Sequence, residues 1–205
     1  MNQKGNILEE LINYLKNNNG YGRMKELKNN GIHTRTISKA VEKNIIEKIK
    51  PGLYKLVDFS REEYSSFIDI YRAKNDAVIC LLSALEYYDL TTFNPSKITV
   101  AVPNNTDKFN LNYPPIEVYY FSNKMYSAGI QEIQKKNDKF KIYSPEKSIA
   151  DIFRYRNKLG EDIALEVLGN YLQKPSADIN ELREFGKKCR VKTIINPYIK
   201  AMLNQ

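Results

Sequence analysis

The pattern that most constrains the fold lies in the first 57 residues, where three short amphipathic segments precede a β-prone hairpin. The helical spacing of the apolar residues predicts three helices, over residues 5–18, 23–30 and 34–43. The hairpin is centred on Pro51-Gly52, a pair suited to the two central positions of a tight turn. Three small helices followed by a basic hairpin predict a winged helix-turn-helix.

The third predicted helix has two different faces. Ile37, Ala40 and Val41 fall on the side expected to face the core. The opposite side is polar and basic, and in a winged helix it would enter the major groove of DNA. The residues predicted to contact or approach base edges are Arg35, Thr36, Ser38 and Lys39. Those predicted to position phosphates are Arg23, Lys25, Lys43, Lys48, Lys50 and Tyr54.

The charge distribution supports a nucleic-acid partner for this segment. The chain has 32 Lys and Arg against 24 Asp and Glu, and 11 of the former but only 5 of the latter lie in residues 1–57. We therefore expect a basic DNA-binding domain over 1–57 and a nearly neutral body over 58–205. The alternative is that the N-terminal domain is a protein-interaction module.

The body is predicted to be an α+β domain, with a small sheet packed by several helices. Predicted strands cover residues 98–102, 116–121 and 139–143, with 130–133 as a possible fourth. Predicted helices cover residues 61–73, 77–88, 145–157, 161–173, 178–188 and 191–203.

The body offers no recognisable catalytic motif. It lacks a Gly-Ser pair followed by closely spaced aspartates, and it lacks a phosphate-binding Gly-rich loop. Asp151 and Arg154 have the i, i+3 spacing of an ordinary helical ion pair, so we predict a structural role for Asp151. The alternative function is a nucleic-acid-processing enzyme that depends on Asp151 or Glu117. A second basic patch that contacts DNA or RNA is predicted at Arg154, Arg156 and Lys158.

The remaining composition excludes other classes of site. The chain has one His and two widely separated Cys, Cys80 and Cys189, too few for a Cys/His zinc site. We predict no metal, no cofactor and no catalytic residue. No apolar run reaches the length of a membrane span, and the N-terminus has no secretory-signal pattern. We therefore expect a cytoplasmic protein with reduced thiols and no membrane partner.

Four segments in this order resemble the AbiEi family, the antitoxins of abortive-infection, type IV toxin–antitoxin systems. These segments are Lys50–Leu56, Val78–Leu85, Ile98–Pro103 and Ile142–Arg156. The resemblance covers nearly the whole chain. It implies a winged helix that represses its own operon at an inverted-repeat operator, and a C-terminal antitoxin domain that counters a nucleotidyltransferase toxin without needing a stable complex. A solitary regulator with no adjacent toxin is the alternative, and the oligomeric state is open.

Overall fold

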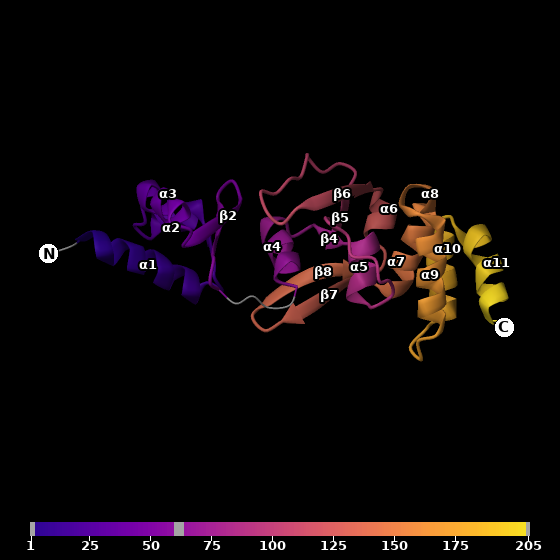
Figure 1. The fold of residues 1–205 in the computed structure, drawn as a ribbon. Coiled ribbons are helices and arrows are strands. Elements are labelled where there is room, and N and C mark those ends of the chain that lie inside the picture. The colour runs from indigo at the N-terminus through magenta and orange to yellow at the C-terminus, as the bar shows by residue number, and fades with distance from the viewer. Residues whose placement is uncertain (1–2, 60–63, 204–205) are drawn as a thin grey trace. The chain divides into compact units, whose positions relative to one another are not determined.

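The computed structural model describes residues 3–59 and 64–203. The chain is an α+β protein, as predicted, with helices and two sheets of three and five strands (Figure 1). It divides into two compact units. Unit 1 comprises Met1–Asn75, Asn110–Pro115 and Gln134–Lys139, and unit 2 comprises Asp76–Phe109, Ile116–Ile133 and Phe140–Gln205. The first division between them thus follows Asn75, beyond the domain boundary predicted after residue 57.

Unit 1 begins with a small helical and β assembly that has its own core. Its elements are α1 (Gln3–Asn17), β1 (Tyr21–Arg23), α2 (Met24–Asn29), α3 (Thr34–Glu42), β2 (Ile46–Lys50), β3 (Leu53–Leu56) and α4 (Ser65–Ala73). The three strands form an antiparallel sheet in the order β1-β3-β2. The core consists of Leu11, Leu15, Leu27, Ile32, Ile37, Ala40, Ile46, Tyr54 and Leu56.

Two glycines permit the tight connections in this assembly. Gly31, between α2 and α3, has a φ of +78°, and Gly52, between β2 and β3, has a φ of +80°. Side chains with a Cβ atom rarely adopt such values. Gly52 lies in the turn predicted at Pro51-Gly52. Helix α3 begins at Thr34, where its predicted range also begins, and His33 is its N-cap.

The first residues of the predicted helix 61–73 lie outside the described part of the chain, which omits residues 60–63. Its remainder is α4, which buries Phe67, Ile68, Ile70 and Ala73. The helix also buries Asp69, a carboxylate within an otherwise apolar face. Such a group needs a partner to offset its lost hydration.

The sheet of five strands contains β4 (Val78–Ile79), β5 (Ile98–Pro103), β6 (Ile116–Phe121), β7 (Ile130–Lys135) and β8 (Asp138–Tyr143). Its order is β6-β5-β4-β8-β7. Strand β5 is parallel to β6 and antiparallel to β4, while β4 is parallel to β8. The predicted strands therefore exist, and the segment 130–133 is part of a strand as well.

One sequence prediction in this region was wrong. We predicted a continuous helix over 77–88, but Val78 and Ile79 form β4, and α5 begins only at Leu81 (Leu81–Tyr87). The side chain of Thr99 on β5 accepts a hydrogen bond from the Ser83 amide, and Ser83 Oγ accepts one from the Thr99 amide. These bonds fix the start of α5 against the sheet. Because every residue from Ala77 to Leu85 is buried, the segment has no periodicity that separates strand from helix.

Helices form the rest of unit 2. They are α6 (Asn123–Tyr126), α7 (Pro145–Arg154), α8 (Arg156–Leu159), α9 (Glu161–Leu172), α10 (Ile179–Lys188) and α11 (Lys192–Leu203). Helix α7 lies at their centre and contacts α5, α9, α10 and α11 (Figure 1). Ser144 caps α7, and its Oγ accepts a hydrogen bond from the Lys147 amide. No helix in the described part of the chain is long and apolar enough to cross a bilayer.

Candidate nucleic-acid interface

Helix α3 presents a basic, unpartnered face to solvent. Ile37 and Ala40 anchor its inner side and are 1% and 0% exposed. Arg35, Ser38 and Lys39 are exposed on the outer side, as predicted. Within the described residues, none of these three side chains has a hydrogen-bond or ion-pair partner. Their donors are therefore available to base edges or phosphates.

The other α3 residues in the predicted set differ in their accessibility. Thr36 is half-buried, so its hydroxyl is less accessible than those of its neighbours. Lys43 is the C-cap residue of α3 and is exposed. Glu42 is also exposed and places a carboxylate near the C-terminal end of the same helix. The positive charge on the exposed face of α3 is consequently carried by Arg35 in the first turn and Lys39 in the last turn.

The two predicted residues at the start of α2 have different environments. Lys25 is exposed. Arg23 donates a hydrogen bond from Nη2 to the Arg72 carbonyl at 3.0 Å, so its guanidinium joins α2 to α4. Its backbone amide donates to Glu26 Oε2, also at 3.0 Å, which satisfies one of the free amides at the helix start. Arg23 is thus a structural residue that also retains an exposed surface.

The hairpin of β2 and β3 keeps only part of the predicted phosphate-binding set accessible. Lys48 is exposed, whereas Lys50 is half-buried and its ammonium donates to the Ala73 carbonyl. Burial lowers the pKa of Lys50, and the charges of Arg23 and Lys74 lower it further. The carbonyl of Ile49, also on β2, accepts a hydrogen bond from the Asn112 amide. Lys48 is therefore the better-placed phosphate ligand on this hairpin.

The structure buries most of Tyr54, which was predicted to contact phosphate. Tyr54 is 6% exposed and belongs to the core of unit 1. The cause is β1, which was not predicted and which pairs with β3 so that Tyr54 lies opposite Gly22. With β1 on one side and β2 on the other, β3 is the central strand, and all four of its residues are buried. Alternation within β3 alone could not reveal this burial.

Unit 1 also contains a buried polar cluster that was not predicted from the sequence. Asp69 of α4 is 1% exposed and accepts hydrogen bonds from two groups on the small sheet. Tyr21 donates its hydroxyl to Oδ1 at 2.6 Å, and Lys55 donates its ammonium to Oδ2 at 3.0 Å. Burial and the Asp69 charge raise the pKa of Tyr21, so its hydroxyl stays protonated. The isolated carboxylate among the apolar residues of 64–71 was the signal that could have indicated it.

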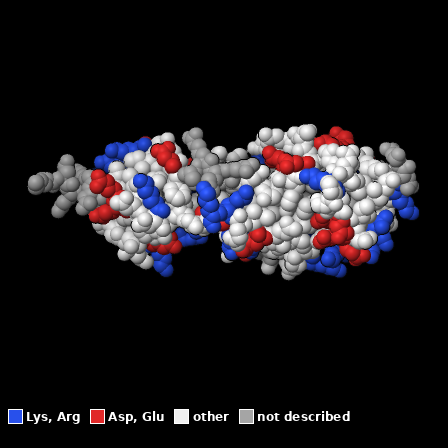
Figure 2. Space-filling model, turned by 90° about the horizontal axis from the view of Figure 1, so that it is seen from below, with Lys and Arg blue, Asp and Glu red and all other residues white. Residues whose placement is uncertain are grey.

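The predicted second basic patch in unit 2 is largely engaged in intramolecular contacts. Arg154 donates to the Cys189 carbonyl at 3.1 Å and Arg156 to the Phe153 carbonyl at 2.9 Å. Lys158 contacts Glu117 Oε1 at 2.6 Å, and this hydrogen bond lowers the pKa of Glu117. Acidic and basic side chains are also interspersed on the face of unit 2 visible in Figure 2. The structure brings the three cations near partners of their own.

The predicted partner of Asp151 was also wrong. Asp151 pairs with Lys147 one turn earlier on α7, and both side chains are 0% exposed. The Lys147 ammonium lies 4.3 Å from the centroid of the Tyr143 ring and 4.9 Å from that of Phe121. The Cys189 thiol donates to Asp151 Oδ1 at 3.4 Å. The i, i+3 spacing predicted Arg154 as the partner of Asp151. In the structure the partner is Lys147, which is buried on the same face of α7 as Asp151.

Two comparisons with known proteins found no match. No protein-family model matches the chain, and no curated protein matches it. Within residues 3–59 and 64–203, no three His, Cys, Asp or Glu side chains are grouped as a metal site requires. The resemblance to the AbiEi family therefore depends on the four sequence segments, and its functional content is a proposal.

Proposed function

We propose that the N-terminal part of unit 1 is a winged helix-turn-helix that binds operator DNA through α3. The observation that carries this proposal is the exposed, unpartnered set Arg35, Ser38 and Lys39 opposite a buried apolar face. Arg can donate two hydrogen bonds to guanine in the major groove, and Lys and Ser reach base edges or phosphates.

The arrangement of the surrounding elements supports the same function. Helices α2 and α3 are joined by the short turn at Gly31, and the hairpin of β2 and β3 follows α3 directly. Lys25, Lys43 and Lys48 are exposed cations on these three elements. Phosphate contacts of this kind position a protein on DNA and make its affinity depend strongly on salt.

A gel shift with the DNA upstream of the protein's own gene tests the DNA-binding proposal. The Arg35→Ala/Lys39→Ala variant should lose specific binding while retaining the wild-type circular dichroism spectrum. A matched control is Lys124→Ala/Lys200→Ala, which removes two exposed cations from unit 2. Equal binding by the wild type and the α3 double variant would overturn the assignment of α3.

We further propose that the chain is the autorepressor and antitoxin of an AbiE-like system, acting against a nucleotidyltransferase toxin. The support is the sequence resemblance, whose most specific segment, Glu146–Asp151, lies in α7. That segment is buried, so its residues maintain the fold of unit 2. The antitoxin surface must then be formed by other, exposed residues of the same unit.

The antitoxin proposal predicts a reading frame for a nucleotidyltransferase toxin beside this gene, and co-expression with that toxin tests it. The wild-type chain should restore growth in the presence of that toxin. The full-length Arg35→Ala/Lys39→Ala variant, expressed from an unrelated promoter, should also protect, because protection is assigned to unit 2. No protection by the folded wild-type protein would refute the antitoxin proposal while leaving DNA binding intact.

A further inference from the structure

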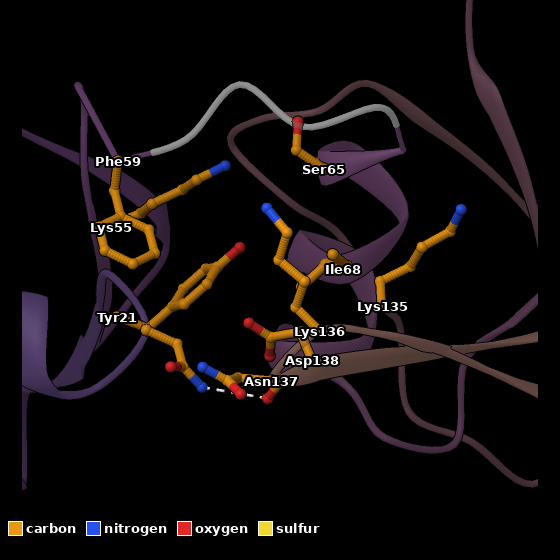
Figure 3. Close-up of a pocket in the computed structure, with 10 residues that line it drawn as sticks. Tyr21, Lys55, Phe59, Ser65, Ile68, Lys135, Lys136, Asn137 and Asp138 are labelled. Atoms are coloured by element: carbon orange, nitrogen blue, oxygen red, sulfur yellow. Dashed lines mark hydrogen bonds between the residues drawn. The ribbon is translucent and has the colours of Figure 1, made fainter.

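Unit 1 contains a cavity of about 190 Å³ that the DNA-binding proposal does not use. It is lined by Asn19, Tyr21, Lys55, Phe59, Ser65, Ile68, Lys135, Lys136, Asn137 and Asp138, all of which belong to this unit. The small sheet, α4 and the turn between β7 and β8 supply its walls (Figure 3). Three segments that are distant in sequence therefore build one site.

The cavity has a fixed cation in its wall. Lys55 is 8% exposed, and Asp69 accepts one hydrogen bond from its ammonium at 3.0 Å. A lysine ammonium has three donors, so this group can also donate to a ligand. Asp69 in turn is held by the Tyr21 hydroxyl, which restricts the position of the whole cluster. The orientation of Lys55 is therefore preorganised.

A second cation approaches from the opposite wall. Figure 3 shows the side chains of Lys55 and Lys136 extending toward each other, with the Tyr21 hydroxyl nearby. Lys136 is exposed and lies in the turn between β7 and β8. Asn19 Nδ2 donates to the Asn137 carbonyl at 3.1 Å and ties this turn to the first loop of unit 1. With three lysines and one aspartate in the lining, the formal charge of the cavity is positive.

The same cavity has an apolar side. The Tyr21 ring, Phe59 and Ile68 line it beside the lysines. An inorganic anion would leave these surfaces unused, whereas a flat ring joined to a phosphate would contact both parts. Base rings stack favourably on aromatic side chains, and phosphate oxygens accept strong hydrogen bonds from ammonium groups. The cavity is open to solvent, so a ligand larger than about 190 Å³ can extend out of it.

We propose that this cavity binds a nucleoside monophosphate, with the phosphate between Lys55 and Lys136 and the nucleoside against Tyr21, Phe59 and Ile68. The proposal does not depend on the DNA-binding or antitoxin function, because it uses none of the residues assigned to α3.

Isothermal titration of the full chain tests the proposal with three probes: adenosine 5′-monophosphate, adenosine and inorganic phosphate. The monophosphate should bind about tenfold or more tightly than either of the others, because it alone contacts both the lysines and the apolar wall. Absence of heat with the monophosphate at millimolar concentration would overturn the proposal. Equal affinities for monophosphate and inorganic phosphate would also overturn it, since the apolar wall would then bind nothing.

Charge reversal locates the site. Lys136→Glu should weaken monophosphate binding by about tenfold or more, because it replaces an attractive charge by a repulsive one. Lys28→Glu, on the exposed surface of α2, makes the same change in net charge away from the cavity and should leave the affinity unchanged. Both positions are exposed, so both variants should fold. Equal effects of the two variants would show that binding reflects overall charge and would reject this site.

Discussion

Helices α3 and α7 carry charged residues at the same i, i+4 spacing but use them in opposite ways. On α3, Arg35 and Lys39 project to solvent without an intramolecular partner among the described residues. On α7, Lys147 and Asp151 are fully buried and paired with each other. Spacing alone places two side chains on one face, and the surroundings of that face decide whether they bind a ligand or stabilise the fold.

The energetic consequences of the two arrangements also differ. Burying Lys147 and Asp151 removes both charges from water, and their attraction offsets this cost only while both are present. The cations on α3 retain their hydration and cost little in the free protein. Loss of one charge should therefore destabilise unit 2 through α7, and should impair binding without destabilising unit 1 through α3.

The largest predicted effect is on Lys147. Lys147→Met should lower the free energy of unfolding by about 3–5 kcal/mol, because it leaves the Asp151 carboxylate buried without its partner. Urea unfolding followed by circular dichroism measures this change. The double variant Lys147→Met/Asp151→Leu removes both charges and should recover most of the loss. A single-variant loss below about 1 kcal/mol would mean that the pair does not stabilise the core.

The next effect concerns DNA binding by α3. If Arg35 contacts a guanine, Arg35→Ala should weaken operator binding by about 1–3 kcal/mol and relax specificity at one base pair. Its free energy of unfolding should change by less than about 0.5 kcal/mol, because the side chain is exposed. Lys48→Ala should instead weaken binding to all sequences and reduce the salt dependence. Fluorescence anisotropy with operator and scrambled duplexes distinguishes the two responses.

The third prediction concerns stability at alkaline pH and tests the burial of the Cys189 thiol in the core of unit 2. Burial, followed by the Asp151 charge, raises the pKa of the Cys189 thiol to about 12. The unfolded thiol ionises near pH 9, so unfolding releases a proton above that pH. This contribution to stability is complete below pH 9 and should fall by about 1.4 kcal/mol per pH unit until the folded thiol ionises.

Urea unfolding between pH 8 and 11 measures this loss, and Cys189→Ala provides the matched control. The variant should show a smaller decline over the same range, since the buried tyrosines contribute but the thiol does not. Identical pH profiles for the two proteins would contradict the assignment to Cys189.

Local patterns in the sequence predicted much of unit 1 and the basic face of α3. Arg35, Ser38 and Lys39 could be placed because a helix period and a buried stripe determine which side chains face out. The same approach could not place Tyr54, whose burial depends on pairing with β1. Three residues between two helices carry too little pattern to indicate that strand.

Tertiary packing explains the other differences. The helix predicted over 77–88 is partly β4, because a fully buried strand lacks alternation. Asp69 and Lys55 lie in different segments, and only the packing of α4 against the small sheet brings them together. The cavity beside them also includes the turn between β7 and β8, about 80 residues further along the chain from Lys55. No local pattern could have indicated it.

The smallest predicted effect is on Lys158, which completes the comparison between buried and exposed charges. Lys158 also pairs with a carboxylate, Glu117, but the two side chains are 58% and 40% exposed. Lys158→Gln should therefore lower the free energy of unfolding by less than about 1 kcal/mol, and added salt should reduce even this loss. Urea unfolding at low and high salt measures the loss in the free energy of unfolding and its dependence on salt. A loss as large as that of Lys147→Met would show that exposure does not govern the strength of these pairs.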